Sequence, residues 1–196
     1  MSTPRTHLSL EERVYAASKA AFSAVIKAHP DQNFYAFGLF TDDSLQFLHA
    51  VANTEEALTE TVRRYKKEVD PQFGCTSTHA GMRWAYGDWG FFPEIADEHF
   101  IEINDIVRAN FDLPSEQFAA AVEPMWLAVL TGLKRLEQEH FFGEGHTRSK
   151  ITLLVVGDLP PEFVESWVRE LNPSDVVERY VSWDADAPDS PGGSQQ

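Results

Sequence analysis

The chain has 196 residues, of which 43% are hydrophobic, and this is enough apolar material for one packed core. Lysine and arginine total 16 against 31 aspartate and glutamate residues, so the formal net charge is −15, and this acidity argues against a nucleic-acid partner, which needs clustered positive charge. The sequence has no stretch apolar enough to span a membrane, no apolar signal core near its start and only one cysteine, Cys75, so we expect a cytoplasmic protein without a membrane partner.

The first predicted helix begins at a capping box. Ser9 stands at the cap position and Glu12 follows three residues later, a pattern that satisfies two backbone N–H groups at a helix start. Apolar residues then recur at helical spacing. Pro30 disfavours the helical conformation in the residue before it, so we expect the helix to end at His29.

A β-hairpin is predicted next. Residues 33–41 are rich in aromatic side chains, which favour strands, and the short polar side chains of residues 41–44 suit a turn. Residues 45–51 are predicted to return as the second strand of the hairpin. Alternation along that strand places four side chains on one face: Leu45, Phe47, His49 and Val51.

A helix and an irregular segment are predicted after the hairpin. Asn53 as the cap, with Glu56 three residues later, opens a helix that runs to about Val69. Glycines interrupt residues 71–91, and we expect this segment to be irregular apart from one short strand near residues 82–84.

Helical periodicity returns in residues 93–110. A following helical stretch contains Pro124, so we expect a kink or a break there, and residues 125–140 are strongly helical. The apolar stripe of the first of these helices is formed by Ile95, His99, Ile103 and Ile106.

The clearest predicted strand lies near the C-terminal end. Residues 151–156 are apolar nearly throughout, which is typical of a strand buried on both faces. Pro160 and Pro161 begin a helix that ends near Asn172. Residues 176–183 fit either a helix or a strand.

Together these elements predict a single α/β domain, more narrowly an α+β fold in which several helices pack on a small mixed or antiparallel sheet. We expect the domain to cover residues 1–183. The remaining residues, 184–196, are rich in Asp, Pro, Gly and Ser, so a disordered acidic tail is predicted.

Several segments between residues 10 and 182 carry a family resemblance. They are residues 34–43 (FYAFGLFTDD), 52–58 (ANTEEAL), 83–89 (RWAYGDW), 136–145 (LEQEHFFGEG), Arg148 and 171–173 (LNP). As a set they resemble an uncharacterised bacterial family, the domain-of-unknown-function family 4303. The resemblance implies a soluble, single-domain bacterial protein, and it implies no particular activity.

The segment from Arg83 to Trp89 holds two tryptophans and a tyrosine between an arginine and an aspartate. Trp, Tyr and Arg dominate binding hot spots, so a recognition surface is one interpretation. The alternative is that the indoles fix an irregular loop to the core, while the charged groups satisfy backbone groups or each other. The candidate binding residues are Arg83, Trp84, Tyr86, Asp88 and Trp89.

Metal and nucleophile sites have weaker support. His99 and Glu102 stand three residues apart on a predicted helix and could share a metal, but zinc needs three or four ligands and no second histidine motif completes a site. The apolar stripe favours a partly buried structural His99. Cys75 with His79 could form a nucleophilic pair, against the default of an inert thiol. We expect no metal, no cofactor and no catalytic residues.

The leading functional hypothesis is a non-enzymatic protein-interaction module of the small acidic inhibitor or immunity type. Its negative charge would attract a basic protein partner, and Trp84, Tyr86 and Trp89 would then dock. The alternative is a small-molecule binding protein or hydrolase with a pocket around Arg83, Asp88 and His99.

Overall fold

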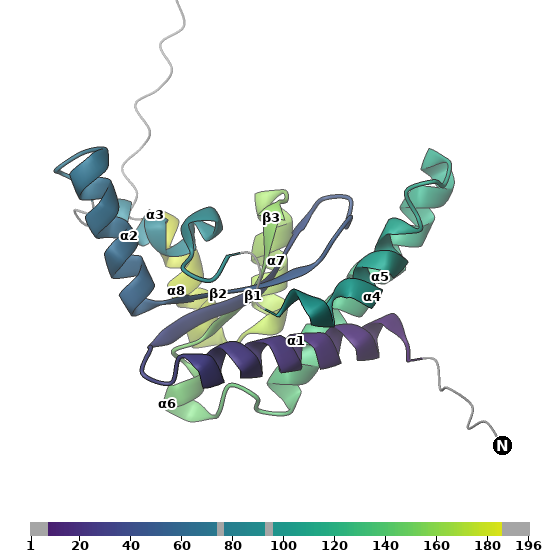
Figure 1. The fold of residues 1–196 in the computed structure, drawn as a ribbon, viewed down its shortest axis with the longest axis horizontal. Coiled ribbons are helices and arrows are strands. Elements are labelled where there is room, and N and C mark those ends of the chain that lie inside the picture. The colour runs from purple at the N-terminus through teal and green to yellow at the C-terminus, as the bar shows by residue number, and fades with distance from the viewer. Residues whose placement is uncertain (1–7, 74–76, 93–95, 186–196) are drawn as a thin grey trace, which may run out of the picture.

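A three-stranded mixed sheet lies at the centre of the fold and has helices on both faces (Figure 1). The computed structural model describes residues 8–73, 77–92 and 96–185. β1 pairs antiparallel with β2 and parallel with β3, so the predicted α+β fold with a small mixed sheet is confirmed. The strands are β1 (Phe34–Asp42), β2 (His49–Thr54) and β3 (Thr152–Asp158), in the order β2-β1-β3.

Helices make up most of the remaining chain. The capping box at Ser9 is present, and the predicted first helix and the helix after β3 are both confirmed. The α-helices are α1 (Leu10–Ala28), α2 (Glu55–Glu68), α3 (Ser77–Trp84), α4 (Ile101–Arg108), α5 (Ser115–Gln138), α6 (Gly145–Arg148), α7 (Pro161–Leu171) and α8 (Ser174–Ala185). Two 3-10 turns, η1 (Tyr86–Asp88) and η2 (Asp97–His99), connect α3 to α4. Nowhere in the described ranges is a helix both long and apolar enough to cross a bilayer.

One face of the sheet packs against α1, α4 and α5. Phe37 and Leu39 of β1 are buried there together with Ile103 of α4. The helices α1 and α5 cross closely, because a Cβ at Gly132 of α5 would lie only 2.9 Å from the Glu11 carbonyl oxygen of α1. This crossing therefore requires a residue without a side chain.

The opposite face packs against α2, α3 and α8. Val51 of β2 and Leu154 of β3 are buried there against Leu58 of α2, Met82 of α3 and Val177 of α8. β3 contributes side chains to both cores, and its first five residues are all buried. The prediction of a strand covered on both faces is confirmed.

The second strand of the hairpin begins later than predicted. It starts at His49, because Leu45 has a left-handed φ of 52° that no continuous strand tolerates. The predicted common face is also wrong, since Leu45 packs in the core under α1 whereas Val51 packs in the core under α2.

Residues 82–84 form the end of a helix, α3, so the predicted short strand is wrong. Gly81 lies inside this helix, and Met82 is buried against the sheet. Packing of α3 between α2 and α8 overrides the low helix propensity that glycine brings to the segment.

Pro124 does not break α5, which continues from Ser115 to Gln138. Proline removes a hydrogen bond to the carbonyl four residues earlier, that of Ala120, and both residues are exposed, so water reaches the carbonyl. The ambiguous residues 176–183 belong to a helix, α8.

Three other predictions fall partly or wholly outside the described residues, those for the stripe of His99, for the tail and for Cys75. His99 is exposed, so the expected partly buried histidine is wrong, and Ile95 of the same stripe lies outside the described residues. Residues 184 and 185 still belong to α8, whereas 186–196, the rest of the predicted tail, lie outside the described part, as does Cys75.

Candidate functional site

A β-bulge at Tyr35 organises the candidate site. Phe34 pairs with Thr54 and Ala36 pairs with Asn53, so Tyr35 has no partner of its own on β2. The extra residue reverses the alternation, and Tyr35 therefore joins Ala36 in the core under α2 and α3. Bulges commonly re-aim a side chain in this way next to functional sites.

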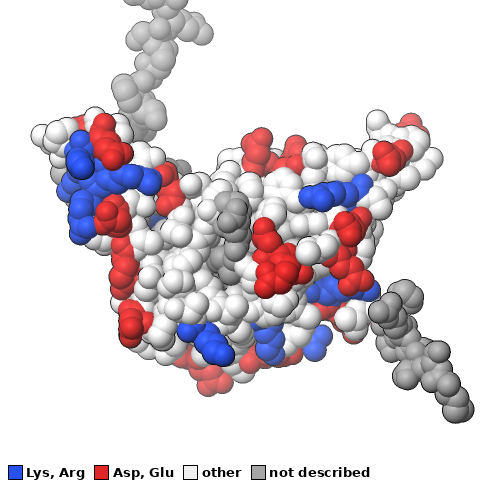
Figure 2. Space-filling view, viewed as in Figure 1, with Lys and Arg blue, Asp and Glu red and all other residues white. Residues whose placement is uncertain are grey.

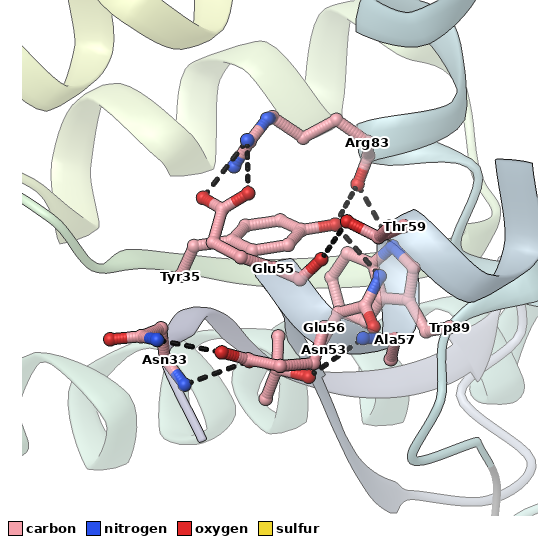
Figure 3. Close-up of polar contacts among 10 residues, drawn as sticks. Asn33, Tyr35, Asn53, Glu55, Glu56, Ala57, Thr59, Arg83 and Trp89 are labelled. Atoms are coloured by element: carbon pink, nitrogen blue, oxygen red, sulfur yellow. Dashed lines mark hydrogen bonds and ion pairs between the residues drawn. The ribbon is translucent and has the colours of Figure 1, made fainter. Parts of the chain in front are cut away.

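The Tyr35 hydroxyl lies at the centre of a buried hydrogen-bond chain (Figure 3). It accepts a hydrogen bond from Asn53 Nδ2 at 2.7 Å and donates to the Arg83 carbonyl oxygen at 2.8 Å. The same carbonyl accepts a bond from Trp89 Nε1 at 3.0 Å, and Gly90 N donates to Asn53 Oδ1 at 3.1 Å. Burial raises the pKa of Tyr35 well above its ordinary value, so the phenol stays neutral and can donate.

Asn53 does not cap α2, and this corrects the predicted helix start. Thr54 is the cap, and its hydroxyl accepts a bond from Ala57 N at 3.2 Å. Glu56 instead accepts two bonds from Asn33, from the backbone N at 2.9 Å and from Nδ2 at 2.6 Å. These bonds lower the pKa of Glu56 and tie the loop before β1 to the start of α2.

The Arg83 side chain is held above the Tyr35 ring. Its guanidinium carbon lies 4.2 Å from the ring centroid, and one terminal nitrogen donates to both carboxylate oxygens of Glu55, at 2.9 and 2.7 Å (Figure 3). The stacking and the ion pair fix the guanidinium at the C-terminal end of α3.

Arg83 and Trp84 line a groove of about 1060 Å³ at the end of the sheet where β1 and β3 begin. Such a volume accommodates a small organic molecule. One wall belongs to the α3 side of the sheet and also includes Tyr35 and Arg179. The opposite wall is apolar and consists of Ile26, Phe34, Phe37, Phe141, Phe142 and Ile151.

The charged residues that line the groove are three cations, Arg83, Lys150 and Arg179, and one carboxylate, Glu55. Arg179 donates to the Ser149 carbonyl oxygen and, at 3.1 Å, to Thr152 Oγ1, so its guanidinium is anchored against the start of β3. Lys150 is exposed and has no ion-pair partner in the described ranges.

The groove is electrostatically positive although the chain as a whole is strongly acidic. Burial lowers the pKa of Arg179, and the charges of Arg83 and Arg148 lower it further, against the opposing effects of Asp175 and Glu55. The arginines therefore lie close enough to repel one another, and an anion between them would relieve that repulsion.

The three aromatic residues of the predicted docking surface have different environments. Trp89 is only 4% exposed, so it belongs to the core. Trp84 is half-buried, with its ring 4.9 Å from that of Tyr180 and 5.9 Å from that of Tyr35. Tyr86 is also half-buried, beside Phe40, and lines a second hollow of about 590 Å³ that it shares with Trp84.

The predicted pocket around Arg83, Asp88 and His99 is not assembled in the groove. Asp88 lies on η1, where it accepts bonds from Arg64 and from the Tyr65 hydroxyl, each at 3.0 Å. His99 is the last residue of η2, and its Nε2 lies 4.0 Å from Glu98 Oε1. Only Arg83 of the three lines the groove.

His99 and Glu102 were considered from the sequence as a pair that could share a metal, although no metal was expected. Glu102 forms an ion pair with Arg13 of α1. Within the described ranges, no three His, Cys, Asp or Glu side chains gather as metal ligands would.

Sequence reasoning missed most residues of the groove, among them Tyr35, Glu55, Lys150 and Arg179. Tyr35 carried a signal, since a phenol in the middle of an aromatic strand needs a polar partner when it is buried. Arg179 carried none, because it lies on α8, 96 positions after Arg83 in the sequence.

The comparisons with known proteins identify a family and nothing narrower. A search of curated proteins finds no match, and a search of solved structures finds none either. A family model described as "Domain of unknown function (DUF4303)" matches residues 14–173, a span that contains both walls of the groove apart from the α8 residues Arg179 and Ser182. The chain therefore belongs to the domain-of-unknown-function family DUF4303.

Proposed function

We propose that the protein is a binding protein whose groove takes an anionic ligand. The observation that carries the proposal is the concentration of Arg83, Lys150 and Arg179 around one groove in a chain of net charge −15. A concave site with a few convergent charged groups on an apolar background is the usual form of a small-molecule site. The proposal replaces Asp88 and His99 of the sequence-based pocket with Lys150 and Arg179.

The rigidity of the cationic wall supports binding. Arg83 is stacked on Tyr35 and paired with Glu55, and Arg179 is anchored at both terminal nitrogens. Side chains that are already ordered lose little conformational entropy when a ligand arrives, so more of the interaction energy appears as affinity.

A thermal-shift screen of organic phosphates and carboxylates at low ionic strength tests this function. We expect at least one anion to raise the melting temperature of the wild type. Arg179→Gln and Lys150→Gln should each weaken its binding about tenfold, because hydrogen bonds to charged groups are strong. Lys67→Gln, an equal charge change on exposed α2, is the matched control. Equal binding by all three variants would contradict the proposal.

A second proposal retains the acidic interaction module of inhibitor or immunity type. It is favoured by the net charge, and Figure 2 shows Asp and Glu over several parts of the drawn face, while the largest patch of Lys and Arg lies over α2 and smaller ones lie along the lower edge and on the right. A basic protein would be attracted to this surface in the cytoplasm that the single cysteine suggests. Trp89 would not contact it, because Trp89 is buried.

Capture of proteins from a host lysate tests the second proposal. The expected result is one basic protein that is retained at low salt and released at about 0.5 M salt, since exposed charges are screened there. Retention that does not depend on salt would contradict it.

A further inference from the structure

We propose that the ligand of the groove is an organic phosphate, with its dianionic head between Arg83 and Arg179 and an apolar body along Phe34 and Phe141. This inference rests on the proposed function and adds the chemistry of the ligand. It follows from the charge of the lining, the geometry of the guanidinium groups and the apolar wall that faces them.

The charge of the lining selects a doubly charged head. Three cations and the single carboxylate of Glu55 leave a surplus of two positive charges on the groove. A phosphate monoester carries nearly two negative charges at pH 7 and therefore neutralises the site, whereas a monocarboxylate leaves one cation uncompensated.

The guanidinium of Arg83 retains unused donors. One terminal nitrogen contacts Glu55, while Nε and the other terminal nitrogen have no hydrogen-bond partner within the described part of the chain. Planar guanidinium groups bind phosphate oxygens in a two-point geometry, which a lysine cannot reproduce. Lys150, which is exposed and lines the groove, supplies a third cation.

The apolar wall selects an organic ester over free phosphate. Phe34 and Phe141 are half-buried, so each ring exposes an edge or face, and Ile26 of α1 is 37% exposed although it lines the groove. Below them Phe37 and Phe142 are buried with ring centroids 5.1 Å apart and give the wall a firm base. A free phosphate ion would leave this apolar surface in water.

Glu55 acts as an internal competitor for Arg83. Its carboxylate already accepts two hydrogen bonds from the guanidinium, and it is itself half-exposed in the groove. An incoming phosphate must share Arg83 with this carboxylate and approach its negative charge. Glu55→Gln should therefore tighten phosphate binding about threefold to tenfold.

Calorimetric titration with four probes tests the inference on the whole chain. The probes are 2-naphthyl phosphate, inorganic phosphate, 2-naphthoate and 2-naphthol. We expect 2-naphthyl phosphate to bind at least tenfold more tightly than each of the others, because only this probe has both the dianionic head and the apolar body.

A variant of the apolar wall and a matched control test whether that wall contributes to binding. Ile26→Ser should weaken 2-naphthyl phosphate about threefold to tenfold and leave inorganic phosphate unchanged, because only the ester buries apolar area there. Leu127→Ser, at a position that is 64% exposed on α5, is the control and should change neither. Both positions are on the surface of their helices, so both variants should fold.

The outcomes distinguish this inference from the proposed function. Equal affinity for inorganic phosphate and 2-naphthyl phosphate would contradict the claim that the ligand has an apolar body, but the groove would still be an anion site. Equal affinity for 2-naphthoate and 2-naphthyl phosphate would contradict only the claim that the head of the ligand is a dianion. Equal affinity for 2-naphthol, or no binding of any probe, would overturn both proposals. Weaker binding of 2-naphthyl phosphate by Glu55→Gln than by the wild type would contradict the claim that Glu55 competes with the phosphate for Arg83.

Discussion

At the scale of single residues, Tyr35 connects the sheet to the candidate site. Its ring supports the guanidinium of Arg83, and its hydroxyl links Asn53 of β2 to the carbonyl of Arg83 at the end of α3. One side chain thus fixes the position of α3 relative to the bulged strand. Loss of the hydroxyl would leave the buried Asn53 Nδ2 without its acceptor and would remove one of the two hydrogen bonds to the Arg83 carbonyl, which keeps its bond from Trp89.

We predict that Tyr35→Phe lowers the free energy of unfolding by about 1–3 kcal/mol, because buried polar groups that lose their partner keep their desolvation cost. Chemical denaturation gives this value from the midpoint and slope. Tyr65→Phe is the matched control, since that hydroxyl contacts Asp88 near the surface and Asp88 keeps its bond to Arg64. Equal losses for the two variants would contradict the central role of Tyr35.

Residue patterns predicted caps and strands better than they predicted the site. The capping box at Ser9 is local, so the sequence was sufficient there. Asn53 has the same cap chemistry, but the bulge at Tyr35 brings a phenol within reach and the amide bonds to it instead. A bulge depends on the pairing of two strands, and spacing along one strand does not show it.

At the scale of elements, two asparagines cover the two edges of the sheet. Asn104 of α4 accepts a bond from Leu48 N at 2.7 Å and donates to Leu48 O at 3.2 Å, just before β2. Asn172, after α7, makes the same pair of contacts to Leu153 of β3, each at 2.8 Å. Each amide thus replaces a neighbouring strand for one residue, which protects an edge from pairing with another chain.

We predict that Asn104→Ala and Asn172→Ala each lower the free energy of unfolding by about 1–3 kcal/mol. The reason is that Leu48 and Leu153 are fully buried, so their freed backbone groups gain no water. Gln117→Ala, on the exposed surface of α5, should change stability by less than about 0.5 kcal/mol. Urea denaturation measures all three, and losses at the level of the control would contradict the edge role.

Elements set by local sequence were predicted correctly, whereas elements that depend on distant contacts were not. β3 and α7 follow from apolar runs and prolines that act locally. The late start of β2 does not, because it goes with the left-handed φ of Leu45 and with the bonds from Leu48 to Asn104, 56 positions away, and the spacing of residues along the strand shows neither. Likewise α3 depends on packing between α2 and α8, which a glycine-rich segment does not indicate.

At the scale of the whole molecule, the groove lies where both helix layers meet the end of the sheet. Ile26 belongs to the α1 layer and Arg179 to the α8 layer, so the apolar and cationic walls come from opposite faces. The sequence showed which residue types form each wall. It did not show that the two walls face one groove, because no local pattern connects α1 with α8. The acidic surface then surrounds a positive groove, which favours discrimination for charge at that one place.

The α1–α5 contact makes the stability of the molecule depend on pH. Glu139, just after α5, accepts bonds from Lys19 and Tyr15 of α1, and these bonds, Lys19 first, lower its pKa from 4.5 to about 2. A lowered pKa stabilises the fold above pH 4.5, and this stabilisation is lost as the pH falls toward 2. Glu139→Gln should therefore melt below the wild type at pH 7, with a difference that shrinks steadily between pH 5 and pH 3. Glu123→Gln, exposed on α5 with no ion-pair partner in the described chain, is the control, and a difference for Glu139→Gln that stays constant with pH would contradict the prediction.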